Sequence, residues 1–262
     1  MNGQFIDIWL AAGFAAALFV TIIWIISLIK RDASIMDIYW GIGFILVTLV
    51  YYTMTDGYSI RKSLVAILVL IWGVRLSLHI GLRNAGKPED PRYRAWRTAG
   101  GTNWWWRSYF KVFLLQGAIL WIVSLPLLTS QYYTFPVHLT LLDWIGIGLW
   151  TFGFLFESIA DRQLSVFKKD PANKGKVYSA GLWKFTRHPN YFGEAVIWWG
   201  FFMFAASAGG YFTVVSPLLM TFLLLKVSGV AMLDQLLADT KPEYTEYIKR
   251  TNAFFPGLPK QG

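Results

Sequence analysis

The sequence contains no cysteine and only three histidines. Without cysteine, the protein can form no disulfide bond and no thiolate-ligated metal site. The histidines, His79, His138 and His188, are far apart and lack the short spacing that is typical of metal ligands. We therefore expect neither a disulfide-stabilised fold nor a metal centre.

Charged residues are also scarce, at 15% of the chain, whereas 55% of the residues are hydrophobic. This leaves apolar runs that approach the roughly 20 residues needed to cross a bilayer. The runs cover 4–29, 36–55, 63–82, 109–130, 139–160, 190–209 and 211–233. The first run is too long for the core of a signal peptide, so we interpret it as a retained helix. The pattern predicts an all-α fold, an integral membrane bundle of seven transmembrane helices.

The net charge of +9 is compatible with nucleic-acid binding, but the positions of the charges indicate a membrane protein. Most lysines and arginines lie in alternate connections, at 30–31, 83–107, 161–189 and after 233. This alternation follows the positive-inside rule. It predicts an N-terminus outside, a C-terminus in the cytoplasm, contact with membrane lipid and no nucleic-acid partner.

The chain shows no internal repeat, low-complexity tract or flexible linker, so residues 1–262 are predicted to form a single domain. Two of the basic connections, 83–107 and 161–189, are long, and long connections in compact domains are often functional. The amphipathic stretch 234–256 predicts a short helix that folds back under the bundle.

Polar residues are concentrated at 187–194 (RHPNYFGE), directly in front of an apolar run. Asn190 and Glu194 are four residues apart, so they share a face of a helix. Ionisable groups are costly in hydrocarbon and are usually retained for function. The same argument selects Asp37, Arg75, Glu157, Asp161 and Lys226, which lie in or at the ends of other runs. The alternative is that such side chains reach the membrane interface, and it is weakest for Arg75, near the middle of its run.

The usual nucleotide-binding motifs are missing. Residues 40–43 (WGIG) contain a GxG, but residue 46 is leucine and the setting is a membrane helix, so the Rossmann fingerprint fails. There is no phosphate-loop motif either.

Residues 187–194, followed by a Trp-rich helix, resemble a superfamily of membrane enzymes. It includes steroid 5α-reductases, sterol C14 and C7 reductases, and isoprenylcysteine carboxyl methyltransferases. The ending Tyr244-x-x-Tyr247-x-x-Arg250-Thr251-x-x-Phe254-x-Pro256 fits the same pattern. The chain length, the apolar runs and Asp37-x-x-Trp40-Gly41 are most similar to bacterial steroid 5α-reductase-like proteins. The resemblance is strong over 150–258, looser over 30–110 and absent from the first helix.

The resemblance implies an NADPH-dependent oxidoreductase of the 3-oxo-5α-steroid 4-dehydrogenase type. It divides the domain into substrate-side helices (1–130) and a cofactor-binding half (139–258). Matching positions assign cofactor contacts to Asn190, Glu194, Asp161, Arg75 and Asn84, with further contacts from Arg83, Arg162, Arg187, His188, Tyr191, Tyr244, Tyr247 and Arg250. It also implies a lipophilic, steroid-like substrate and no obligate protein partner. The expected location is the bacterial inner membrane, with the cofactor site facing the cytoplasm.

The catalytic donor departs from the family pattern. Animal steroid 5α-reductases carry a Gln-Glu pair on the second helix and a tyrosine on the third, near the substrate ketone. This second run has no Gln-Glu pair, and Trp72 aligns with the tyrosine. Asp37 and Tyr39 are the nearest substitutes, so we assign them as candidate catalytic residues. The alternative for Asp37 is a carboxylate that satisfies backbone amides at a helix N-terminus.

Two other functions fit parts of the sequence. The first is an S-adenosylmethionine-dependent methyltransferase of a lipid or prenylated substrate, because that branch shares the Arg-His-Pro element. The second is a transporter or lipid-binding bundle, but no inverted repeat or pair of broken helices supports it.

The number of cations favours NADPH over S-adenosylmethionine as the cofactor. Seven lysines and arginines suit the phosphate groups of NADPH, whereas S-adenosylmethionine has no phosphate. They are Arg83, Lys87, Arg92, Arg94, Arg162, Lys176 and Arg187.

Overall fold

The computed structural model describes residues 3–227 and 229–260, and within these ranges it contains helices and no strand. The predicted all-α class is therefore confirmed. Six helical segments of the described chain are long and apolar enough to cross a membrane. They are Gly3–Lys30, Ile35–Met54, Ser59–Asn84, Pro91–Tyr132, Leu141–Lys169 and Tyr211–Ala238.

The run predicted at 190–209 forms one continuous helix, α9 (Pro189–Ser207), that is less hydropathic than these six segments. Its asparagine, glutamate, tryptophan and glycine residues lower its hydropathy. A seventh span therefore stays a prediction, as do the sides of the membrane on which the two termini lie.

The chain divides into two compact units. The N-terminal unit comprises Met1–Thr140 and Phe204–Thr213, and the C-terminal unit comprises Leu141–Met203 and Val214–Gly262. Each unit has its own polar cluster, described below. The single domain predicted over 1–262 stays a prediction.

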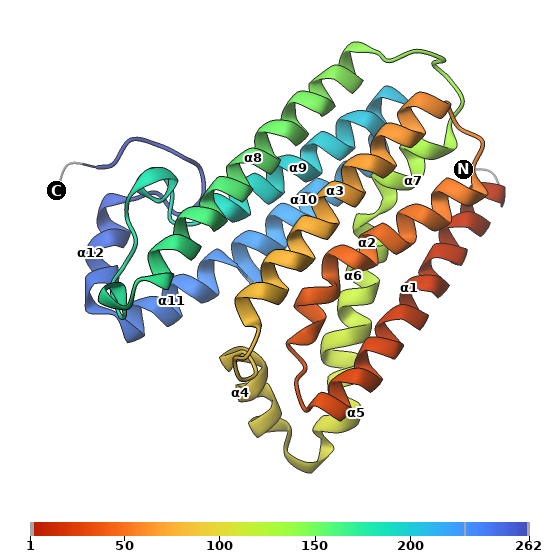
Figure 1. Ribbon diagram of the computed structural model, residues 1–262. Helices are drawn as coiled ribbons and strands as arrows, with labels where there is room; N and C mark the ends of the chain where they lie inside the picture. The colour runs from red at the N-terminus through yellow and green to blue at the C-terminus, as the bar shows by residue number, and fades with distance from the viewer. Residues whose placement is uncertain (1–2, 228, 261–262) are drawn as a thin grey trace. The chain divides into compact units, whose positions relative to one another are not determined.

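The N-terminal unit is built on three long helices, α1 (Gly3–Lys30), α2 (Ile35–Met54) and α3 (Ser59–Asn84), of which α2 packs against both others (Figure 1). The remaining helices are α4 (Pro91–Gly100), α5 (Trp104–Ser108), α6 (Leu115–Val123) and α7 (Leu125–Tyr132). The run predicted as one helix over 109–130 is interrupted. A π-helical stretch at Tyr109–Leu114 precedes α6, and Pro126 lies in the first turn of α7, where proline is tolerated.

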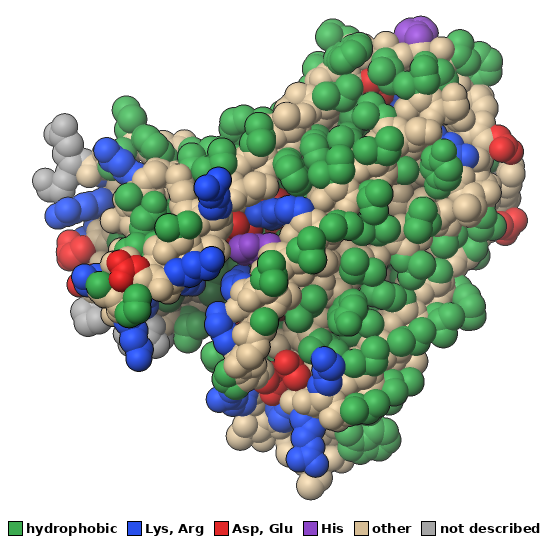
Figure 2. All heavy atoms as spheres, in the orientation of Figure 1, with side chains coloured by type: hydrophobic (Ala, Val, Ile, Leu, Met, Phe, Trp, Pro, Cys, Tyr) green, Lys and Arg blue, Asp and Glu red, His purple; other side chains and the backbone are tan. Residues whose placement is uncertain are grey.

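Glycines allow α2 and α3 to approach closely. A Cβ atom on Gly41 would lie 2.9 Å from the Cα atom of Gly73, so no larger residue fits at this crossing without a shift of the backbone. Small residues commonly permit such backbone contact between membrane helices. In Figure 2, hydrophobic side chains cover the visible faces of α1, α2 and α3, whereas charged side chains gather near α4.

The C-terminal unit begins with α8 (Leu141–Lys169), which packs on α9 through a second glycine contact. A Cβ atom on Gly193 would lie 2.6 Å from the backbone nitrogen of Glu157. The chain then forms α10 (Val215–Phe222), α11 (Val230–Thr240) and α12 (Pro242–Arg250). Where one short C-terminal helix is predicted, the structure thus has two, and α11 contacts α12.

Candidate functional site

The polar cluster of the C-terminal unit is centred on the carboxylate of Asp234, on α11. Arg187 lies two residues before the start of α9 and contacts both carboxylate oxygens, with Nη2–Oδ2 at 2.6 Å and Nε–Oδ1 at 3.2 Å. His188 Nε2 lies 3.0 Å from Oδ1, and the Tyr244 hydroxyl donates to Oδ1 at 2.6 Å. The ion pair is largely buried, with the side chains of Arg187 and Asp234 8% and 16% exposed. Three segments of the chain are therefore held together at one acid.

Arg187 also connects the start of α9 to the end of α12. Its guanidinium donates to the carbonyl oxygens of Ile248 and Thr251, and its backbone nitrogen donates to the Asn252 carbonyl oxygen at 2.9 Å. Carbonyl groups at the end of a helix lack partners within the helix, so a buried guanidinium can satisfy them. Burial lowers the pKa of Arg187, but its hydrogen bonds and ion pair with Asp234 outweigh that effect and raise the pKa overall.

The two tyrosines of α12 are neutral hydrogen-bond donors inside this cluster. Burial and the hydrogen bond to Asp234 raise the pKa of Tyr244, and burial raises that of Tyr247. The Tyr247 hydroxyl donates to the Trp183 carbonyl oxygen, and Trp183 Nε1 donates to the Ala160 carbonyl oxygen at 3.1 Å. These bonds attach α12 to the segment before α9 and attach that segment to α8.

A second contact joins α8 to the start of α9 and consists of two residues that the resemblance assigns to the cofactor. Asn190 Nδ2 donates to Asp161 Oδ1 at 3.2 Å. Asp161 is buried, whereas Arg162 beside it is exposed. Glu194, half-buried, lies one turn beyond Asn190 on α9. This unit thus places an amide, two carboxylates and an arginine near the junction of the two helices.

The other candidate cofactor residues of this unit differ in exposure. The ring of Tyr191 stacks on His188 with centroids 5.6 Å apart. Arg250, on α12, is exposed. The structure gives Arg187, His188, Tyr244 and Tyr247 partners inside the protein, which indicates that they position the backbone. Their contact with a cofactor stays a prediction.

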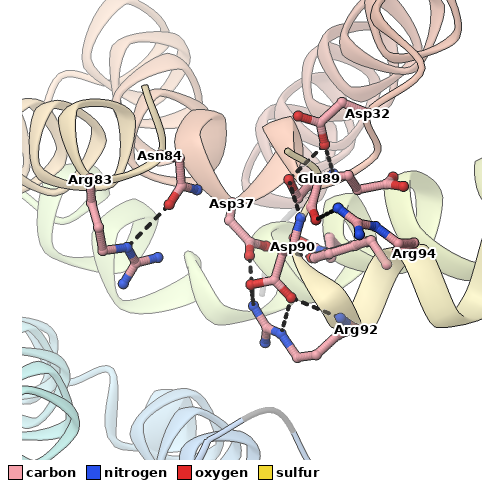
Figure 3. A network of polar contacts seen from close by, with 11 residues as sticks. Asp32, Asp37, Arg83, Asn84, Glu89, Asp90, Arg92 and Arg94 are labelled. Carbon is pink, nitrogen blue, oxygen red and sulfur yellow. Dashed lines mark hydrogen bonds and ion pairs between the residues drawn. The ribbon is translucent and has the colours of Figure 1, made fainter. Parts of the chain in front are cut away.

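The polar cluster of the N-terminal unit surrounds Asp37, in the first turn of α2 (Figure 3). Arg92 Nη2 lies 3.1 Å from Asp37 Oδ2, and the Tyr93 hydroxyl donates to Oδ1 at 2.5 Å. Gln116 Nε2 donates in turn to the Tyr93 hydroxyl oxygen at 3.2 Å. Asp37 therefore accepts hydrogen bonds from two side chains of α4. It is not a carboxylate that binds only the backbone amides at the start of its own helix.

Asp90 holds Arg92 in place. Its carboxylate caps α4 by accepting from the Arg92 backbone nitrogen at 2.9 Å, and it pairs with Arg92 Nε at 3.0 Å. Burial raises the pKa of Asp90, but these contacts with Arg92 outweigh that effect and lower it overall. The neighbouring Glu89 pairs with Arg97 at 2.8 Å and accepts from the Ala33 backbone nitrogen at 2.8 Å. Glu89 thus fixes the start of α4 against the connection between α1 and α2, whereas the Asp90 carboxylate caps α4 and orients Arg92.

The remaining predicted residues of the N-terminal unit lie on α2 and α3. Tyr39 is half-buried and meets the ring of Phe19 edge to face, with centroids 6.4 Å apart. Arg83 is exposed and donates from Nε to Asn84 Oδ1 at 3.3 Å, and Arg75 is half-buried. Arg75, Arg83 and Asn84 belong to one unit and the other candidate cofactor residues to the other. Their convergence on a single ligand therefore stays a prediction.

Sequence reasoning missed Asp234, Tyr93 and Gln116 as members of these clusters. Asp234 and Gln116 could have been selected by the argument that selected Asp37, because each is a polar residue in or next to an apolar stretch. Tyr93 lies in the connection 83–107 and carried no such signal.

Comparison with known proteins places the chain in a family. The chain belongs to the family described as "Protein of unknown function (DUF1295)", whose model matches residues 23–251. It is also similar to an uncharacterized protein of Schizosaccharomyces pombe. The two are 25% identical over 276 residues, which covers 90% of this chain and 76% of the yeast protein. No solved structure matches the chain significantly.

Two relatives with described activities match over shorter stretches. A Delta(14)-sterol reductase of Ascobolus immersus is 30% identical over 105 residues, 34% of this chain and 24% of that protein. A probable O-methyltransferase of Ustilaginoidea virens is 44% identical over 46 residues, 18% of this chain and 16% of that protein. The chain is thus distantly related to a sterol reductase and to a methyltransferase, consistent with the superfamily that it resembles.

Proposed function

We propose that the protein is an NADPH-dependent reductase of a carbon–carbon double bond conjugated to a ketone in a steroid-like lipid. The observation that supports this most is the hydrogen bond between Asp161 and Asn190. It brings together two of the cofactor residues that the reductase resemblance assigns, from helices that are separate in the sequence. The similarity to a sterol reductase supports the same class of reaction.

The side chains near Asp161 and Asn190 fit the chemistry of NADPH. The carboxylates of Asp161 and Glu194 and the amide of Asn190 can hydrogen-bond to the ribose hydroxyls and the carboxamide of the cofactor. The exposed Arg162 and Arg250 suit its phosphate oxygens, because a guanidinium can bind two phosphate oxygens at once. Bound NADPH would supply the hydride. The cluster at Asp234 would hold the start of α9 in position, so that Asn190 and Glu194 present a fixed surface. The alternation of charge in the sequence favours a cytoplasmic position for this surface in a bacterial inner membrane.

Asp37 and Tyr39 are the proposed catalytic residues of the N-terminal unit. As a C–H bond forms at the β-carbon, the π electrons move through the α-carbon to the ketone oxygen, and a hydrogen-bond donor there stabilises the developing enolate. The α-carbon then takes a proton, so the product gains two hydrogens. To donate, Asp37 would have to carry a proton as a neutral carboxyl group, whose oxygens would still accept from Arg92 and Tyr93 and so hold it in one orientation.

The second candidate is an S-adenosylmethionine-dependent membrane methyltransferase acting on a lipid or prenylated substrate. The observation that favours it is the similarity to a probable O-methyltransferase. Its cofactor carries one carboxylate and one ammonium group and no phosphate. The exposed arginines of the C-terminal unit therefore support NADPH as the first choice.

Titration of the purified protein in detergent with each cofactor tests the proposal. We expect saturable binding of NADPH, seen as a change in nicotinamide fluorescence, and no saturable binding of S-adenosylmethionine by calorimetry. Asn190→Ala should weaken NADPH binding roughly tenfold, because it removes a polar contact and leaves Asp161 without this donor. Glu246→Gln, at an exposed position of α12, is the matched control and should bind normally. Saturable S-adenosylmethionine binding without NADPH binding would favour the methyltransferase instead.

A further inference from the structure

The last described residues, 254–260, form an irregular segment whose backbone is fixed to the C-terminal unit. The Gly257 nitrogen donates to the Phe185 carbonyl oxygen at 3.0 Å. The Lys260 nitrogen donates to the Arg250 carbonyl oxygen at 2.9 Å. A segment that is bonded in its middle and at its end holds its side chains in fixed directions, so the surface that it presents is a lasting feature of this unit.

This segment presents an exposed apolar patch. Phe255 is 67% exposed and Leu258 is 84% exposed. Phe185, which the bond to Gly257 joins to the segment, is also exposed. We call these three side chains, Phe185, Phe255 and Leu258, the Phe255 patch. A single exposed apolar residue needs no explanation, but several gathered at one place indicate a surface that binds a partner or a membrane.

A row of phenylalanine rings connects the Phe255 patch to a helix that can span the membrane. The ring of Phe255 meets that of Phe192 on α9, with centroids 6.2 Å apart, and Phe192 meets Phe156 on α8 at 5.4 Å. Phe156 in turn contacts Phe152, one turn away, at 5.4 Å. Phe152 is exposed on α8, which is a candidate span. The row therefore runs from a lipid-facing position of α8 to the patch.

The Phe255 patch lies at the level where the apolar part of α8 ends. The run predicted over 139–160 ends at Ala160. The indole of Trp183, two residues before Phe185, donates to the Ala160 carbonyl oxygen at 3.1 Å. Phe156, in the aromatic row, lies about one turn before Ala160. A spanning helix leaves the hydrocarbon where its apolar run ends, so the patch is positioned at the membrane interface.

Two lysines flank the Phe255 patch. Lys184 directly precedes Phe185, and Lys260 is two residues beyond Leu258. Both are exposed, and neither ammonium group forms an ion pair within the described part of the chain. Apolar side chains beside such cations match the surface of a membrane with anionic lipids, which has hydrocarbon beneath a layer of phosphate groups.

We propose that the Phe255 patch anchors the C-terminal unit to the bilayer. Phe255 and Leu258 insert among the acyl chains next to the interface, and Lys184 and Lys260 contact the phosphate groups of anionic phospholipids. The aromatic row favours lipid over a protein partner, because it joins the patch to a helix that is itself a candidate span. The anchor goes beyond the proposed reductase function and depends on neither NADPH nor a steroid-like substrate.

Fluorescence quenching of the full chain in nanodiscs tests the anchor. The chain has no cysteine, so Leu258→Cys provides a single site for a bimane label. In discs of phosphatidylcholine and phosphatidylglycerol, we expect a nitroxide near the top of a lipid acyl chain to quench this label strongly. Aqueous acrylamide should quench it weakly. Thr245→Cys, at an exposed position of α12, is the matched control and should show the opposite pattern.

Substitutions separate the apolar and the charged parts of the anchor. Fluorescence lifetimes give the ratio of lipid-inserted to free label at position 258. Phe255→Ser should lower this ratio roughly tenfold, because one ring no longer enters the acyl chains. Lys184→Gln should lower it about fivefold, the usual contribution of one lysine near an anionic surface, and should have no effect in discs of phosphatidylcholine alone. Lys169→Gln removes the same charge about 14 Å beyond Ala160 along α8 and should change nothing.

The opposite results are equally clear. A label at 258 that acrylamide quenches as strongly as at 245, with no quenching by the lipid nitroxide, would overturn the anchor. Protection from acrylamide without quenching by the lipid nitroxide would also overturn it and would show that protein, such as a second copy of the chain, covers the patch. Equal ratios in Lys184→Gln and Lys169→Gln would refute the contact with anionic phosphate groups. A variant counts as folded when its gel-filtration profile matches that of wild type.

Discussion

Replacing Asp234 by asparagine is expected to lower the free energy of unfolding by about 3 kcal/mol. The substitution keeps the volume but removes the charge that Arg187, His188 and Tyr244 share. It leaves the guanidinium of Arg187 buried without its counterion, and breaking a buried ion pair from one side is strongly destabilising. The value is at the lower end of the usual range because the Asp234 side chain retains 16% exposure. Unfolding by SDS in mixed micelles, followed by circular dichroism, measures the effect.

Glu246→Gln is the matched control for this prediction. Glu246 pairs with Lys249 one turn further along α12, but both side chains are more than half exposed, so no measurable change is expected. Binding of NADPH by Asp234→Asn should weaken together with stability, because α9 loses its connection to α11 and α12. If Asp234→Asn unfolds like wild type, the cluster does not hold these segments together.

Asp37→Asn is expected to lower kcat about 100-fold, because an amide is a far weaker acid than a protonated carboxyl group and stabilises the enolate oxygen less, while NADPH binding stays within about twofold. The reason is that Asp37 acts at the ketone and the cofactor contacts are assigned elsewhere. Stopped-flow NADPH oxidation gives kcat, and fluorescence titration gives the dissociation constant. Tyr39→Phe, measured in the same way, tells which of the two candidates is the donor. An equal loss of turnover and of NADPH affinity in Asp37→Asn would refute the catalytic role.

A structural role for Asp37 requires its own control, since Asp37 also pairs with Arg92. Asp90→Asn supplies it, because Asp90 contacts the same arginine and caps α4. If the effect of Asp37→Asn arose only from release of Arg92, Asp90→Asn would lower kcat as much. We expect Asp90→Asn to destabilise the protein modestly and to retain most of the turnover.

Most of the helices were predictable because the signal is local. An apolar run long enough to cross a bilayer indicates a helix wherever it lies, and 36–55 matches α2 (Ile35–Met54) to one residue at each end. The interruption of the run at 109–130 was harder to predict. Pro126 marks one break, but a π-helical stretch depends on packing around it and leaves no pattern in the sequence.

The candidate site was predictable only in part, because its contacts join residues far apart in the chain. The resemblance selected Asp161 and Asn190, and the structure joins them by a hydrogen bond. Nothing in residues 187–194 indicates that the partner of Arg187 lies 47 residues further on, at Asp234. Likewise, Asp37 was selected as an ionisable residue in an apolar run, but its partner Arg92 lies 55 residues away and comes from a different helix.

The central claim is tested most directly by incubating the purified protein in detergent with NADPH and a 3-oxo-Δ4 steroid. We expect NADPH oxidation that requires both components, and a product whose mass is greater by two hydrogens. With 4-deuterated NADPH of the correct face, one deuterium should appear at the β-carbon. A steroid recovered unchanged while S-adenosylmethionine methylates a lipid acceptor would contradict the reductase assignment.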